Sequence, residues 1–173
     1  MAITYKKIAS VTVGSGGAAN IDFTSIPGTY TDLVLLISSR SNRSANADDT
    51  VFRINGNTSN IYSYRQLYGF TSGAGSANAT DTKAFIGQMP AASSTASTFD
   101  SSLVYFPNYA GSTNKSYSIE NVWENNSSTV WQLNMFAGLW ANTSAITSIS
   151  LFSNNSNNFV QYSTATLYGI LKA

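Results

Sequence analysis

The longest near-continuous apolar run in the chain, Leu33 to Ile37, is the best guide to its fold. Five residues are too few for a buried helix, and the run is rich in branched side chains. Pro27-Gly28 before it and a Ser-Asn-Arg-Ser stretch after it indicate turns. The run therefore predicts a strand in the middle of a sheet, covered on both faces. Since no segment is convincing as a helical crossover, the second cover must be another sheet or another subunit, which indicates a sandwich and an oligomer.

Alternating apolar and polar positions predict further strands along the chain. Residues 8–13 and 21–23 have a hairpin-like or edge pattern, and Asn55-Gly56 is the strongest signal for a tight reversal. Residues 72–78 consist of glycine, alanine and polar residues, so a flexible, exposed connection is expected there. Other strands are expected at residues 51–54, 61–70, 85–89, 99–106, 145–152 and 164–171.

Residues 115–124 and 129–140 form the clearest predicted hairpin, divided by the turn residues 125–128. Alternation places Asn121 with the aromatic side chains of the first strand and Asn134 beside Phe136 on the second. In total about ten short strands, separated by turn signals, predict an all-β fold. We expect a single domain spanning residues 1–173, an antiparallel β-sandwich of jelly-roll-like type.

Composition narrows the classes of function. The chain has no cysteine and no histidine, so disulfides, thiolate metal sites and the usual general base are all missing. Only 10% of residues are charged and the net charge is +1, which argues against a nucleic-acid or anionic-membrane partner. Short uncharged polar side chains suit permanent protein contacts or sugar binding. The N-terminal residues lack a signal-peptide pattern and no run is long enough for a membrane span, so synthesis in the cytoplasm is expected.

One short segment carries oxygen ligands at close spacing. Asp48 and Asp49 follow Asn46, and these side chains could help to hold Ca²⁺. No further carboxylate follows at useful spacing, so a solvated turn is favoured and no metal or other cofactor is expected. Arg40 and Arg43 flank the same region, and we expect them to pair with these carboxylates or with those of a partner.

Glu120 and Glu124 are the one pair of glutamates that a glycosidase mechanism could use. Both should point to the same face of one strand, with Cα atoms roughly 13 Å apart. This separation exceeds the spacing of paired catalytic carboxylates, so no enzymatic activity and no catalytic residue is expected.

Large aromatic side chains are the remaining candidates for a site. Exposed rings can stack on sugars, but packing in the core or at a subunit interface explains them more readily. With so few charged groups, a free monomer would have little to keep it dispersed, and we expect a homotrimer. The candidate interface residues, which compete with roles in the core, are Trp123, Trp131, Trp140 and Tyr68.

Several short motifs make the chain resemble small virion structural proteins of tailed bacteriophages. They are Ile26-Pro27-Gly28-Thr29-Tyr30-Thr31-Asp32-Leu33, Phe52-Arg53-Ile54-Asn55-Gly56, Ala145-Ile146-Thr147-Ser148-Ile149, and Asn158-Phe159 ahead of Thr166-Leu167-Tyr168-Gly169-Ile170. The resemblance covers most of the chain. It implies symmetric oligomers, commonly trimers, and carries no catalytic residues.

The function expected from this resemblance is that of a capsid decoration (cement) protein. Such a protein binds the major capsid protein and stabilises the head shell of the virion. The alternative is a tail-fibre or receptor-binding module that contacts a host surface glycan.

Overall fold

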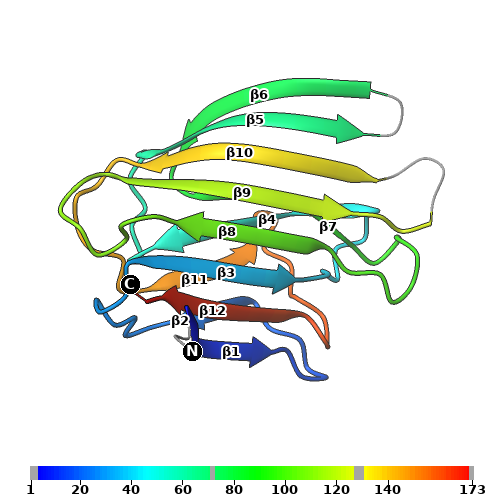
Figure 1. Ribbon diagram of the computed structural model, residues 1–173. Coiled ribbons are helices and arrows are strands. Elements are labelled where there is room, and N and C mark those ends of the chain that lie inside the picture. The colour runs from blue at the N-terminus through cyan, green and yellow to red at the C-terminus, as the bar shows by residue number, and fades with distance from the viewer. Residues whose placement is uncertain (1–3, 71–72, 127–130, 172–173) are drawn as a thin grey trace.

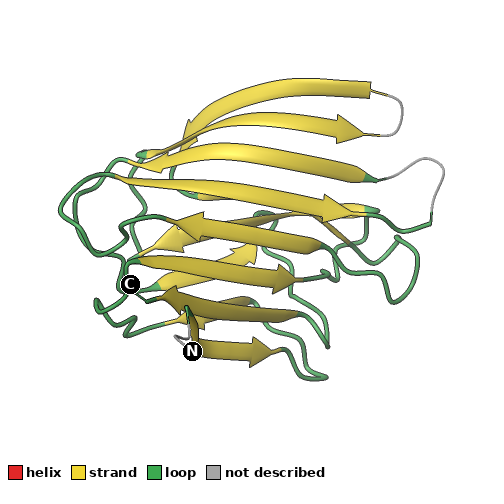
Figure 2. Ribbon diagram, viewed as in Figure 1, coloured by secondary structure: helices red, strands yellow, loops and turns green. Residues whose placement is uncertain are grey.

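The computed structural model describes residues 4–70, 73–126 and 131–171. Within these ranges the regular elements are all β-strands, and the paired strands run antiparallel (Figure 2). The all-β antiparallel sandwich is confirmed, with twelve strands rather than about ten. Its assignment to the jelly-roll type stays a prediction. The strands are β1 (Tyr5–Thr12), β2 (Asn20–Phe23), β3 (Asp32–Ser38), β4 (Ala47–Ile54), β5 (Tyr62–Phe70), β6 (Gly73–Asp81), β7 (Ala84–Pro90), β8 (Ser101–Phe106), β9 (Lys115–Trp123), β10 (Gln132–Trp140), β11 (Ile149–Ser153) and β12 (Thr164–Ile170).

The strands form two sheets of unequal size. The large sheet has eight strands in the order β1-β12-β3-β8-β9-β10-β5-β6, and the small sheet has four in the order β2-β11-β4-β7. In Figure 1 the small sheet lies behind the lower part of the large one, and β5 and β6 extend past it at the top. One face of the large sheet therefore covers the core, and the other, which we call the outer face, is turned away from the small sheet.

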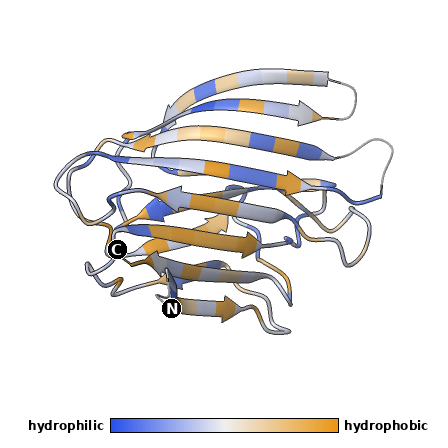
Figure 3. Cartoon of the chain, in the orientation of Figure 1, coloured by the Kyte–Doolittle hydropathy of each residue, from blue (hydrophilic) through white to orange (hydrophobic). Residues whose placement is uncertain are grey.

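The core lies between the sheets and follows from alternation along the strands. Leu33, Leu35 and Ile37 of β3 point into it, and β3 is apolar along nearly its whole length (Figure 3). Phe52 of the small sheet packs edge-on against two rings of the large sheet, with centroid distances of 5.6 Å to Phe106 and 5.3 Å to Tyr117. Interlocked aromatic contacts of this kind fix how the two sheets sit on each other.

Residues 73–78 correct the expectation of a flexible connection, because they belong to strand β6; Ser72 lies outside the described residues. β6 pairs with β5 from Phe70 opposite Gly73 to Tyr62 opposite Asp81. Small side chains do not prevent this backbone ladder, and an edge strand beyond the small sheet needs no apolar face. For this reason β6 could not be recognised from alternating apolar and polar residues in the sequence.

Two predicted hairpins also need correction, since their strands lie in different sheets. β1 is an edge of the large sheet and β2 an edge of the small one, so only the edge character of this region was predicted correctly. Asn55 and Gly56 do form a tight turn, with φ of 52° and 64°. The chain then crosses from β4 in the small sheet to β5 in the large sheet. The β9–β10 hairpin is confirmed, although residues 127–130 of its connection lie outside the described residues.

Strand β11 is shorter than predicted because the side chain of Asn55 binds the residues before it. Asn55 Nδ2 donates to the Ala145 carbonyl at 2.8 Å, and its Oδ1 accepts from the backbone N–H groups of Thr147 and Ser148 at 2.8 and 3.0 Å. These bonds replace the sheet ladder, so regular pairing begins only at Ile149.

Candidate functional site

The outer face of the large sheet carries a continuous row of side chains across five strands. In cross-strand register, Leu36 lies opposite Leu103, Leu103 opposite Glu120, Glu120 opposite Met135, and Met135 opposite Leu67. Directly opposed side chains on one face lie about 5 Å apart, so neighbours in this row are in reach of each other. Four of the five are apolar.

These apolar side chains are open to solvent to an unusual degree. Leu36 is 41% exposed, Met135 59% and Leu67 66%. In the adjacent row Val122 and Leu133, which are register partners, are 48% and 46% exposed. Single exposed apolar residues are normal, but a contiguous apolar surface over several strands marks an interaction site.

The prediction that Leu33 to Ile37 is covered on both faces holds except at Leu36. Leu33, Leu35 and Ile37 face the small sheet, and Val34 on the other face is only 5% exposed, whereas Leu36 is 41% exposed. Leu36 is therefore the side chain of this run that is left for a partner to cover.

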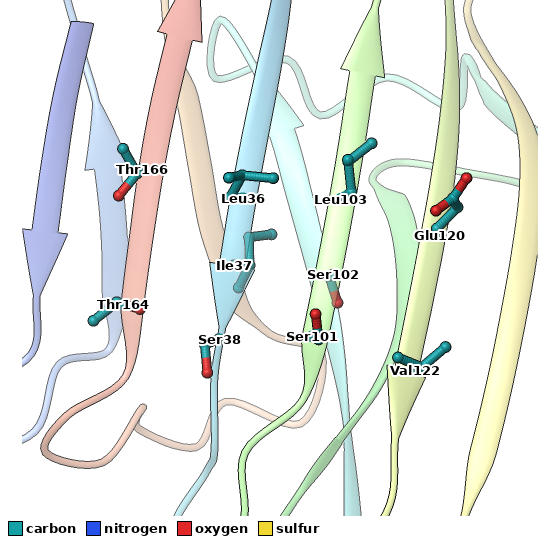
Figure 4. A pocket seen from close by; sticks show the side chains of 10 residues that line it. All are labelled: Leu36, Ile37, Ser38, Ser101, Ser102, Leu103, Glu120, Val122, Thr164 and Thr166. Carbon is teal, nitrogen blue, oxygen red and sulfur yellow. The ribbon is translucent and has the colours of Figure 1, made fainter. Parts of the chain in front are cut away.

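The outer face is also hollowed. Three cavities lie on it, with volumes of about 370, 450 and 430 Å³. Figure 4 shows the first, in which Leu36, Leu103 and Val122 come from three neighbouring strands and Glu120 lies at the side. The second lies among Arg65, Leu67, Met135 and Ala137, and the third among Phe99, Val122, Trp131 and Leu133. Hollows beside protruding aliphatic groups can accept side chains of a partner.

Three charged groups lie within this apolar surface, two negative and one positive. Glu124 is exposed and lines the third cavity. Glu120 is an exposed residue in the middle of the row, and Arg65 is exposed on β5, where it lies opposite Ala137. Arg65 Nη1 donates to the carbonyl of neighbouring Tyr64 at 2.9 Å. A partner that presents the opposite signs at these points would match this face.

The four predicted interface residues lie in different places. Trp140 is 1% exposed and stacks on Tyr62 in the core, and Trp123 is 3% exposed, so both have almost no surface to offer a partner. Tyr68 is half-buried on the inner face, beside Phe70. Trp131 is half-buried and lines the third outer-face cavity. Trp123 also touches this cavity, but of the two only Trp131 has appreciable exposed surface there.

Asp48 corrects the expectation of a solvated turn, because it is fully buried and lies in strand β4. Its carboxylate accepts hydrogen bonds from Ser153 Oγ at 2.8 Å and from the side-chain amides of Asn155 and Asn157 at 2.7 and 3.3 Å. Arg43 lies 3.8 Å away and forms the expected ion pair. Asp48 thus anchors the turn after β11. Across the described part of the chain, no three or more Asp and Glu residues gather as metal ligands.

Arg40 differs from its expected role, because it binds carbonyl oxygens instead of a carboxylate. Its guanidinium donates to the backbone of Ser94, Thr95 and Thr98 at 3.0, 2.7 and 3.1 Å. Burial lowers the pKa of Arg40 from its ordinary value. This side chain holds the irregular segment before β8 in place.

A chain of buried polar side chains crosses the inner face of the large sheet. Asp100 is buried and accepts hydrogen bonds from Ser39, from Ser102 Oγ at 2.6 Å and from Asn121 Nδ2 at 3.3 Å. Asn134 Nδ2 then donates to Asn121 Oδ1 at 2.7 Å. Burial raises the pKa of Asp100 to about 6, while these hydrogen bonds lower it. The sequence signal for this network was the alternation that places Asn121 with the aromatic side chains of its strand and Asn134 beside Phe136. Alternation alone gave these asparagines no role.

Comparisons with protein-family models, with curated proteins and with solved structures find no match to this chain. No helix among the described residues has the length and apolar character needed to cross a membrane.

Proposed function

We propose that this protein is a non-enzymatic structural component of a tailed-bacteriophage virion, a decoration protein that binds the head shell as a symmetric oligomer. The observation that carries the proposal is the apolar, hollowed outer face of the large sheet. The resemblance of the sequence to small phage virion proteins supplies the biological setting. The apolar and hollowed outer face of the large sheet is suited to permanent contact with another protein subunit.

The partner that best fits the outer face is a second copy of the chain. Arg65 gives the face a positive group, and Glu120 and Glu124 give it two negative groups. A symmetry rotation that brings Arg65 of one copy opposite a glutamate of another repeats this charge pair at every copy of the interface. A standard interface buries about 800 Å² from each partner, which is roughly a tenth of the 8408 Å² surface of this chain. The two rows across the outer face lie close enough together to contribute to one such contact.

Association by this route also explains the composition. Only 10% of residues are charged, so little electrostatic repulsion opposes contact between copies. A trimer that covers its outer faces would leave the small sheets and the loops to bind the major capsid protein. The alternative assignment, a tail-fibre or receptor-binding module, would use the same self-association and would differ in its place on the particle.

Two measurements test the proposal. Light scattering and native mass spectrometry of the purified protein should give a trimer, and a stable monomer at micromolar concentration would contradict the oligomer. Purified protein added to head shells that lack it should bind saturably, in a fixed ratio to the major capsid protein. Copies per particle on the order of hundreds support the shell, whereas a few tens or fewer support the tail.

A further inference from the structure

A separate crevice lies where the end of the large sheet meets the small sheet. Tyr64 of β5 and Asp81 of β6 lie on one wall, and Asp49 of β4 lies on the other. Val51, Ala79, Lys83, Phe85 and Asn154 also line it. The crevice is thus built where β5 and β6 extend past the small sheet, away from the outer face proposed for self-association.

Asp49 supplies one carboxylate to the crevice. It is half-buried, and its carboxylate accepts hydrogen bonds from the side chain of Asn154 and, at the 3.5 Å limit, from Gln88 Nε2. Burial raises the pKa of Asp49. The backbone N–H of Asn154 donates to the Asp49 carbonyl at 2.9 Å and so holds the Asn154 amide beside the carboxylate. A carboxylate next to an amide offers acceptors and donors on one wall.

The opposite wall holds a second carboxylate with a cation beside it. Lys83 Nζ lies 3.3 Å from both oxygens of Asp81, and the backbone N–H of Thr82 donates to Asp81 Oδ1 at 2.6 Å. The charges of Asp81 and Asp49 reach the hydroxyl of Tyr64, and after the effect of burial they contribute to raising its pKa. Carboxylates, an ammonium, an amide and a phenol thus face one small space.

The floor of the crevice is apolar and its size is limited. Phe85 packs against Tyr64 with ring centroids 6.0 Å apart, and Val51 and Ala79 complete the floor. The cavity volume is about 230 Å³, below the roughly 300–1,000 Å³ typical of sites for larger ligands. This space suits one small ring with an apolar face and several hydrogen-bonding substituents.

We infer that the crevice binds a single sugar ring of a glycan. The C–H face of the ring would lie on Phe85 and Ala79, and its hydroxyl groups would donate to the carboxylates of Asp49 and Asp81. Asn154 and Lys83 would donate to ring and hydroxyl oxygens. The inference goes beyond the proposed shell binding, because it uses a different surface and needs no partner copy.

Two other ligand classes fit the crevice less well. A divalent cation would find two carboxylates, one of which Lys83 already neutralises, and this falls short of the six to eight oxygens that Ca²⁺ takes. An anionic ligand would meet two carboxylates against one ammonium, a local charge of −1. A neutral polyol avoids both conflicts.

The test uses the full-length protein and a panel of methyl glycosides, namely glucosides, galactosides, mannosides and N-acetylglucosaminides. Saturation-transfer and heteronuclear NMR should detect millimolar binding of at least one, with the largest shifts at residues of the crevice. Asp49→Asn should weaken that binding about tenfold or more, because a charged acceptor is lost. Asp22→Asn, an exposed carboxylate on β2 that accepts from Ser150, should bind as the native protein does.

Ala79→Phe provides a variant that keeps every charge and fills the floor of the crevice, and it should abolish binding. Ala79 lies on an edge strand, so we expect the melting temperature to change little. The inference is overturned if no glycoside in the panel binds, if Asp49→Asn and Ala79→Phe bind as well as the native protein, or if only calcium produces saturable shifts. Each outcome is independent of trimer formation and of shell binding.

Discussion

Gly87 on β7 lies so close to Asn121 on β9 that a Cβ atom added to Gly87 would overlap the Asn121 side-chain amide. Gly87 has a φ of 139°, which L side chains rarely adopt, and it lies at the irregularity in the pairing of β4 with β7. Asn121 in turn links Asp100 to Asn134 and donates to the Gln88 carbonyl at 3.0 Å. The two sheets can therefore approach at this point only because Gly87 has no side chain, and the buried amide of Asn121 fills the space that this leaves.

Gly87→Ala should destabilise the protein by about 3 kcal/mol, because the new methyl group meets the Asn121 amide and the backbone conformation disfavours alanine. Chemical denaturation of both proteins measures the difference in unfolding free energy. Gly56→Ala is a control for the backbone effect alone, since Gly56 also has positive φ, 64°, with open space around it. Equal losses in the two variants would show that the contact with Asn121 is unimportant.

Asp100 should make stability depend on acidity. Its pKa in the fold is about 6 against an ordinary 3.8, so between these values the folded state binds more protons than the unfolded state. The stabilisation that Asp100 contributes is therefore fully present below about pH 4 and falls as the pH rises to about 6, by on the order of 3 kcal/mol. Above that range the contribution is constant. Thermal and urea unfolding between pH 4 and 8 measure the profile.

Asp100→Asn provides the control for this profile, because the amide cannot ionise and stays neutral as protonated Asp100 does. The variant should lose most of the slope between pH 4 and 6. A smaller slope of the same sign should remain from Asp49, whose pKa burial also raises. An unchanged slope in Asp100→Asn would contradict the assignment to Asp100.

Asp48→Ala should destabilise the fold by about 2–4 kcal/mol, since it leaves Ser153 and the amides of Asn155 and Asn157 without their acceptor. Asp22→Ala, at an exposed carboxylate, should cost less than about 0.5 kcal/mol. Because hydrogen bonds engage both carboxylate oxygens of Asp48, a chelator should leave the melting temperature of the native protein unchanged. A large drop with chelator would show that a cation contributes.

Much of the fold could be predicted because β3 contains a near-continuous apolar run and because β5, β8, β9, β10 and β12 carry their own alternation of apolar and polar side chains. Three features of the fold could not be predicted from the sequence. The ladder that orders β6 comes from β5, the burial of Asp48 comes from asparagines 107 and 109 residues further along, and the sheet that each strand joins is set by contacts distant in sequence. Local patterns contain none of this information.

The proposed interface stays a prediction, and the structure bears only on which side chains a partner could reach. The excess of apolar over charged residues predicted an interface, and the largest rings were chosen as its candidates, but Trp140 and Trp123 are buried in the single chain. The alternation in β10 already placed Leu133 and Met135 on the face opposite the buried Asn134 and Phe136. Aliphatic residues on that second face are the side chains that the structure leaves exposed.

Leu67→Glu should convert the expected trimer into a soluble monomer. Leu67 is 66% exposed in the single chain, so the change should not disturb the fold, whereas in an interface it would bury a charge among aliphatic side chains. We expect association to weaken by about a hundredfold or more, measured by sedimentation and light scattering over a range of concentrations.

Tyr162→Glu is the matched control, because Tyr162 is 67% exposed but lies in the turn before β12, away from the hollows of the outer face. It should assemble like the native protein. A second pair of variants distinguishes the interface from the core. Trp131→Glu should also give soluble monomer. Trp140→Glu should give insoluble protein, because Trp140 is 1% exposed and stacks on Tyr62. If Leu67→Glu remains a trimer with native affinity, the copies meet elsewhere, and self-association does not explain the exposed row from Leu36 to Leu67.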